Sequence, residues 1–139
     1  MPGPDPTHWL YRLTPAEWLA AAETELGQTA EALGRRAFRP GVTHARRAAG
    51  MAWNAVLAAE SDDARSADLI ARFGRSYMEH VVALSSATDV PDDVRAAAQL
   101  LRDTPPAPPE LVHLGKPDLS VLDAAGAITA HARQVSENG

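Results

Sequence analysis

The stretch VTHARRAAGMAWNAVLAAE, residues 42–60, decides the fold class of this chain. Small apolar residues recur along it three and four positions apart, a spacing that places them on one face of an α-helix. They are Ala45, Ala48, Ala49, Ala52, Val56 and Ala59. Small side chains on this face permit close packing against other helices. Met51, Trp53 and Leu57 widen the apolar surface, which is compatible with a second packing partner such as another subunit.

The segments on either side of this stretch also predict helices. Thr14 is placed as an N-cap, with Pro15 at the first helical position and Glu17 three residues after the cap. This is the pattern of a capping box, and we expect a helix from there to about residue 36. Pro40-Gly41 then separates this helix from the next.

Three further helices are expected, over residues 64–85, 92–102 and 120–135. The proline-rich segment of residues 104–109 is expected to be extended. Because no stretch alternates between apolar and polar residues, we predict an all-α, up-and-down bundle of four to five helices. Residues 1–13 are expected to form an N-terminal leader and residues 14–139 a single helical domain.

Composition excludes several classes of function. The chain has 139 residues, no cysteine and a net charge of −5. It therefore has no disulfide, cysteine-ligated zinc site, iron–sulfur cluster or thiol nucleophile, and it is not a generally basic nucleic-acid coat. Since neither a signal peptide nor an apolar stretch of bilayer length is present, we expect a cytoplasmic protein without a membrane partner.

The segment Arg75-Ser76-Tyr77-Met78-Glu79-His80 combines two residue types that suffice to cleave RNA without a metal. A histidine can take the proton of a ribose 2′-hydroxyl, and an arginine can stabilise the crowded phosphate. In an uninterrupted helix, however, Arg75 and His80 would point about 140° apart. The catalytic interpretation therefore needs a break near Gly74, or a cleft at a subunit interface.

A structural interpretation of the same segment is also open. His80 shares its side of the helix with Phe73, Tyr77 and Leu84. On this interpretation His80 is a buried structural histidine, and Arg75 is a solvated arginine paired with Glu79 one turn later. A polar row of Arg72, Ser76 and His80 is a third arrangement.

A run of basic residues precedes and enters the stretch at 42–60. It consists of Arg35, Arg36, Arg39, Arg46 and Arg47, with His44 among them. No acidic residue lies between Glu31 and Glu60, so the run predicts a local positive patch suited to a phosphate backbone. A solvated helix end is the simpler alternative. A metal site of His44, His80 and His131 would require three helices to converge, and because no pair of ligands has helical metal spacing we expect neither a metal nor a cofactor.

The chain resembles a HEPN domain (higher eukaryotes and prokaryotes nucleotide-binding) over roughly residues 15–135. Two long leading helices, with an alanine-rich second one around residues 45–52, are one point of resemblance. The Arg75…His80 spacing matches the family's Arg-x4–6-His motif, and residues 123–128 suit its closing helix.

The resemblance implies a helical bundle, commonly a homodimer, in which two motifs form one composite RNase site. It implies that His80 acts as the base, that Arg75 stabilises the phosphate and that Ser76 is the polar residue following the arginine. RNA or a nucleotide would be the ligand, and a nucleotidyltransferase or the antitoxin of a toxin–antitoxin pair would be a protein partner. The alternative hypothesis, from a different class, is a non-catalytic helical protein–protein interaction module.

Overall fold

A computed structural model describes residues 8–105 and 119–138, and all regular structure within these ranges is helical. A short 3-10 helix, η1 (His8–Arg12), precedes six α-helices. Their bounds are α1 (Pro15–Gly34), α2 (Phe38–Ala59), α3 (Asp63–Phe73), α4 (Tyr77–Ser85), α5 (Asp92–Asp103) and α6 (Ser120–Asn138). The all-α prediction is confirmed for this part of the chain, although it holds more helices than predicted. Of the segment expected to be extended, residues 104–109, only Thr104 and Pro105 lie within the described ranges, and the backbone of Thr104 is extended.

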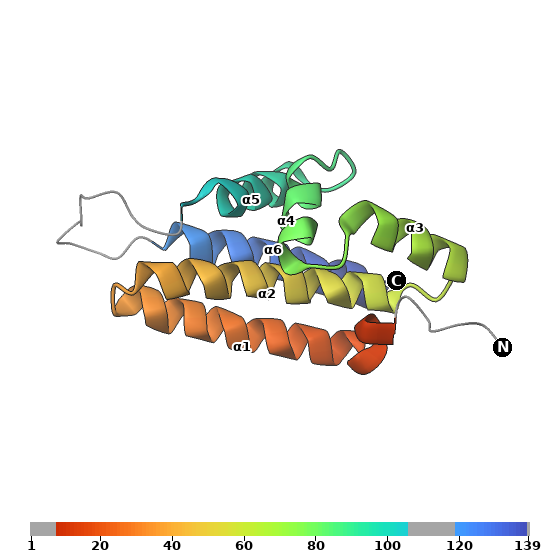
Figure 1. Cartoon of the computed structure of the whole chain (residues 1–139), viewed down its shortest axis with the longest axis horizontal. Helices are drawn as coiled ribbons and strands as arrows, with labels where there is room; N and C mark the ends of the chain where they lie inside the picture. Colours follow the sequence, from red (N-terminus) through yellow and green to blue (C-terminus); the bar gives the residue numbers. More distant parts are fainter. Residues whose placement is uncertain (1–7, 106–118, 139) are drawn as a thin grey trace.

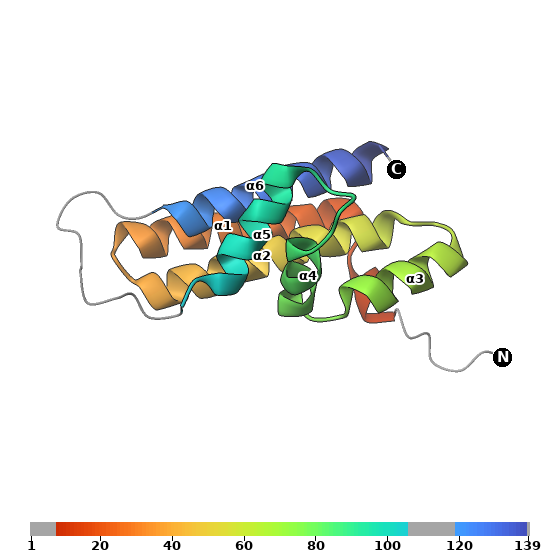
Figure 2. The same ribbon diagram turned by 90° about the horizontal axis from the view of Figure 1, so that it is seen from above.

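Three long helices, α1, α2 and α6, run lengthwise beside one another (Figure 1). The shorter helices α4 and α5 lie across α2 and α6 on one face of this unit, and α3 extends toward one end of the molecule (Figure 2). The apolar core lies between these layers. No helix within the described ranges is both long enough and apolar enough to span a lipid bilayer.

The start of α1 follows the predicted capping box. The Thr14 side chain accepts a hydrogen bond from the Glu17 backbone N–H, and the Glu17 carboxylate accepts one from the Thr14 N–H, at 3.1 and 2.9 Å. Trp18 donates its indole N–H to the carbonyl of Leu10, which is fully buried. The helix η1, which falls in the expected leader, therefore packs against the domain through Leu10, while residues 1–7 lie outside the described ranges.

Helix α2 begins four residues earlier than predicted, at Phe38. Pro40 and Gly41, expected to separate two helices, lie in its first turn. Proline is tolerated there because the first N–H groups of a helix have no intrahelical partner. The turn lies before them, at Arg36, whose φ of 60° is in the left-handed region.

Helices of the same chain cover the apolar surface of α2. The residues that widen its apolar face, Met51, Trp53 and Leu57, are all buried, so no second subunit is needed to cover them. Gly50 brings α4 especially close, because a Cβ atom there would lie 2.3 Å from Cβ of Tyr77. The small residues of α2 thus allow α1, α4 and α6 of the same chain to pack closely against it.

The region expected to be one helix over residues 64–85 is two helices. Helix α3 ends at Phe73, and Gly74 follows with a φ of 78°, a conformation that favours glycine. Ser76 then caps α4, and Glu79 completes a capping box by accepting a hydrogen bond from the Ser76 N–H. The sequence does contain the signals for this interruption. A glycine commonly ends a helix, and the Ser-x-x-Glu pattern of Ser76 and Glu79 commonly begins one.

Candidate functional site

The predicted catalytic residues Arg75, Ser76 and His80 lie at the connection between α3 and α4. Because the helix is interrupted at Gly74, Arg75 precedes α4 instead of lying on it. The angle of about 140° between the Arg75 and His80 side chains, which holds for an unbroken helix, therefore does not apply. The Arg75 side chain is exposed and contacts no described residue through a hydrogen bond or ion pair. Glu79, expected to pair with it, is instead part of the Ser76 cap, whose hydrogen bonds lower the pKa of the Glu79 carboxyl.

His80 lies in the core. Its side chain has no exposed surface. The ring Nδ1 lies 2.8 Å from the carbonyl oxygen of Phe73, and Nε2 lies 2.7 Å from the side-chain oxygen of Asn54. Phe73 is the last residue of α3 and Asn54 belongs to α2, so His80 of α4 connects three helices.

The hydrogen bonds of His80 depend on its protonation state. A carbonyl only accepts, so Nδ1 donates its proton to Phe73. Burial lowers the pKa of His80, which favours a neutral ring whose Nε2 must accept a hydrogen bond. The Asn54 side-chain amide can supply this hydrogen bond when its nitrogen, instead of its oxygen, faces Nε2. This orientation requires only a flip of the amide group, whose oxygen and nitrogen are nearly indistinguishable in shape. That orientation also gives a partner to the Asn54 nitrogen, which is otherwise buried without one among the described residues.

Arg75 and His80 therefore share no accessible surface within the chain. A substrate phosphate could reach Arg75, but the ring of His80 is enclosed and both of its nitrogens are used. Arg72, the third member of the alternative polar row, lies on α3 and pairs with Asp89.

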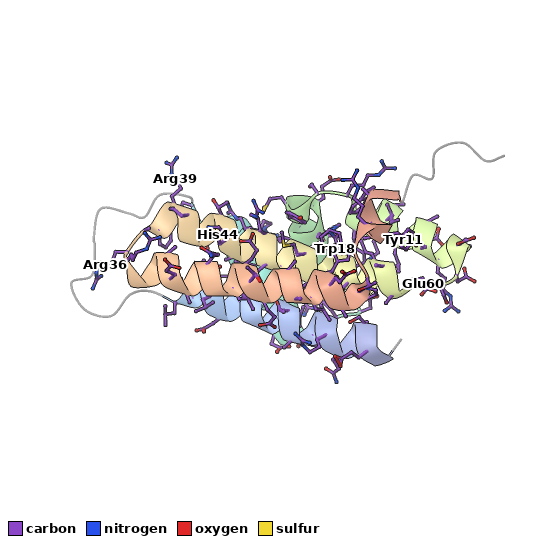
Figure 3. The ribbon with its side chains drawn as sticks, turned by 90° about the horizontal axis from the view of Figure 1, so that it is seen from below. Tyr11, Trp18, Arg36, Arg39, His44 and Glu60 are labelled. Atoms are coloured by element: carbon purple, nitrogen blue, oxygen red, sulfur yellow. The ribbon has the colours of Figure 1, made fainter. Side chains whose placement is uncertain are left out.

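The predicted basic run separates into three groups. Arg35, Arg36 and Arg39 are exposed at the turn between α1 and α2, where Figure 3 shows Arg36 and Arg39 projecting from the end of the molecule. Arg46 is half-buried and donates to the carbonyls of Leu101 and Thr104, at the end of α5. Those carbonyls have no intrahelical partner, so Arg46 caps a helix.

Arg47 belongs to a cluster that the sequence interpretation did not include. Its Nε lies 3.0 Å from the Glu25 carboxylate, and the second Glu25 oxygen lies 2.5 Å from Nδ1 of His44. Glu25 is buried on α1, whereas His44 and Arg47 are partly exposed on α2. Tyr77 of α4 is near enough for the charges of Arg47 and Glu25 to act on its pKa, which burial raises.

A sequence signal for this cluster does exist. Glu25 follows the buried stripe of α1, with Trp18, Ala22, Thr29 and Leu33 at spacings of three and four. A carboxylate on a buried face needs a cationic or hydrogen-bonding partner. The sequence could not say which of the arginines and histidines supplies it.

A groove of about 430 Å³ lies between α3 and the ends of α2 and α6. Its aromatic wall consists of Trp53, with Phe73 at 5.2 Å and His131 stacked at 6.1 Å between ring centroids. The guanidinium of Arg72 lies 4.6 Å from the centre of the Phe73 ring and pairs with Asp89, whose pKa it lowers. Arg72 and Asp89, two of the charged residues that line the groove, thus neutralise each other.

The described residues contain no group of three potential metal ligands. His44 is paired with Glu25, His80 is enclosed and His131 stacks on Trp53. These three histidines therefore form no common metal centre. Comparison with protein-family models, curated proteins and solved structures gives no match for this chain.

Proposed function

We propose that this chain is a non-catalytic helical protein–protein interaction module, in which His80 has a structural role and Arg75 is a solvated surface arginine. One observation supports the proposal: His80 has no exposed surface, and both of its ring nitrogens are hydrogen-bonded inside the bundle. A general base must come within hydrogen-bond reach of the proton that it removes. His80 meets this requirement only if α4 leaves α2.

RNA cleavage by matched variants tests this proposal. We expect wild type, His80→Ala and Arg75→Ala to leave a labelled RNA equally intact, and His80→Ala alone to lower the melting temperature. Light scattering should detect a dimer or a complex with another protein. RNA cleavage that requires both Arg75 and His80 would contradict the proposal, as would a monomer whose melting temperature does not change in His80→Ala.

A second candidate is HEPN-like RNA binding. Its support is the exposure of Arg35 and Arg39 at the turn between α1 and α2, together with exposed Arg75. Exposed guanidinium groups suit phosphate oxygens. In this proposal the protein is a homodimer, with a nucleotidyltransferase or an antitoxin as partner. Cleavage of RNA would also need a second conformation, or a contact between two subunits, that makes the His80 ring accessible to the substrate.

RNA affinity at several salt concentrations distinguishes the second candidate. If the arginines bind phosphates, the double variant Arg35→Ala, Arg39→Ala should bind a labelled RNA more weakly and with a shallower salt dependence, by about one unit of slope for each lost phosphate contact. Arg65→Ala, an exposed arginine on α3, is the matched control. Equal affinities for the double variant and this control would contradict the candidate.

A further inference from the structure

We propose that Glu25, His44 and Arg47 form a binding site for a phosphate group, to which the Arg47 guanidinium donates and which the open Nε2 of His44 faces. The inference does not depend on the proposed function, because it uses none of the residues of the Arg75…His80 motif.

The first step is the orientation of His44. The Glu25 carboxylate, which accepts and does not donate, lies 2.5 Å from Nδ1 and so fixes the proton on that nitrogen. Nε2 is left without a hydrogen-bond partner among the described residues. An outer carboxylate on one ring nitrogen, with the other nitrogen open, is how proteins orient a histidine toward a ligand. His44 is 30% exposed, whereas His80 has no exposed surface.

The second step is the position of Arg47. Only its Nε is used, at 3.0 Å from Glu25, and its two terminal nitrogens bind no residue within the described ranges. The side chain is 49% exposed. A guanidinium that is anchored through Nε and open at its terminal nitrogens can donate to a phosphate oxygen in a fixed geometry.

The third step is the charge of the site. Both oxygens of the Glu25 carboxylate are engaged, one by each partner on α2. Arg47 offsets the charge of Glu25, so the buried carboxylate does not leave the site with a net negative charge. Arg39 and Thr43 precede Arg47 at helical spacing and are exposed as well. Helix α2 contains no acidic residue, so none of its side chains would repel an anion at the site. This arrangement favours an anion.

A structural clamp between α1 and α2 would use the same contacts but would bind nothing. The two roles are separated by a binding experiment. Histidine ring signals of the full chain would be followed by NMR during titration with inorganic phosphate and 5′-AMP. Anisotropy of a labelled oligouridylate would report binding of a phosphodiester backbone. We expect the signal that is absent in His44→Gln to shift, while the signal of His131 stays in place.

Matched variants complete the test. Arg47→Ala should weaken binding about tenfold, as expected when a charge-assisted hydrogen bond is lost, and Arg47→Lys should weaken it less. Arg65→Ala should bind as wild type does. A shift with phosphate or 5′-AMP would support a free phosphate as ligand, and a response to the oligonucleotide alone would support a backbone phosphate.

Two results would overturn the inference. One is an unchanged His44 signal with no affinity for any of the three probes. The other is equal binding by Arg47→Ala and Arg65→Ala. Because loss of the Glu25 contact could unfold the hairpin of α1 and α2, each variant is first checked by its thermal melt, and Arg47→Lys replaces Arg47→Ala if the latter does not fold.

Discussion

His80 shows how one residue holds three helices together. Its ring satisfies the last carbonyl of α3 and the side chain of Asn54 on α2, while its own backbone belongs to α4. Both of these partner groups lie in the interior, where no solvent replaces a lost hydrogen bond. Arg75, five residues earlier, contributes no contact to this network.

We therefore expect His80→Ala to be strongly destabilising. The variant leaves two buried polar groups unpaired and opens a cavity, which together should cost about 2–4 kcal/mol of unfolding free energy. Arg75→Ala should change it by less than about 0.5 kcal/mol, as for most surface substitutions. Urea unfolding of both variants gives the measurement, and equal losses in the two would refute the structural role of His80.

The pH dependence of stability follows from the same burial. Burial lowers the pKa of His80 in the folded chain below the ordinary value of 6.5. As the pH falls below 6.5, the unfolded chain binds a proton that the folded chain does not, so stability decreases until the folded pKa is reached. Urea unfolding at pH 7.5 and 5.5 should show a larger loss for wild type than for His80→Gln. Equal losses would mean that His80 does not control this transition.

At the scale of the elements, the connection from α3 to α4 is the decisive feature. Gly74 has a positive φ, and a Cβ atom there would lie 2.5 Å from the Glu79 side chain that caps α4. Two separate reasons therefore favour glycine at this position: the positive φ of its backbone and the lack of space for a Cβ atom beside Glu79. Without the break, the residue that becomes the cap of α4 would lie inside a continuous helix.

Two glycine substitutions give a matched test of this connection. Gly74→Ala should destabilise the chain by about 1–2 kcal/mol, since the left-handed region is unfavourable for alanine. Gly27→Ala lies within α1, where a Cβ atom meets no other atom within 4 Å, and should stabilise by roughly 0.5–1 kcal/mol through its helix propensity. Thermal melts measure both. The same sign of change in both variants would contradict this account of Gly74.

At the scale of the whole molecule, α3 is set apart from the other helices. It lies toward one end of the molecule, outside the long helices (Figure 2). Only Ser66, Ile70 and Phe73 of α3 are buried. Ser66 also contacts the Tyr11 hydroxyl at 3.2 Å, one of the few polar links from α3 to another element.

Hydrogen exchange should therefore begin in α3. A helix with few buried side chains opens at a lower free energy than the helices of the core. We expect the amides of residues 63–73 to exchange faster than those of α2 under native conditions, as measured by mass spectrometry of peptides. Equal protection of α3 and α2 would show that the two open together.

Local signals determined much of the fold. The capping box at Thr14, the small residues of α2 and the acidic start of α5 each involve neighbours within one or two turns, so the sequence alone indicates the helices. The break at Gly74 is also local, because the Ser76…Glu79 pattern is present in the sequence. The single helix predicted over residues 64–85 is wrong because the apolar spacing continues on both sides of Gly74 and by itself indicates one helix.

The contacts between helices were decided only by the tertiary structure. Glu25 meets His44 and Arg47, Arg46 reaches the end of α5, and His80 reaches Asn54. Each pair is separated by 19 residues or more along the chain, and each residue has several chemically equivalent candidates as partner. The sequence by itself determined the all-α class of the described part of the chain and a buried face on α2, because helix periodicity is local. Which histidine is enclosed and which is open depends on how the helices pack, and only the three-dimensional arrangement provides that.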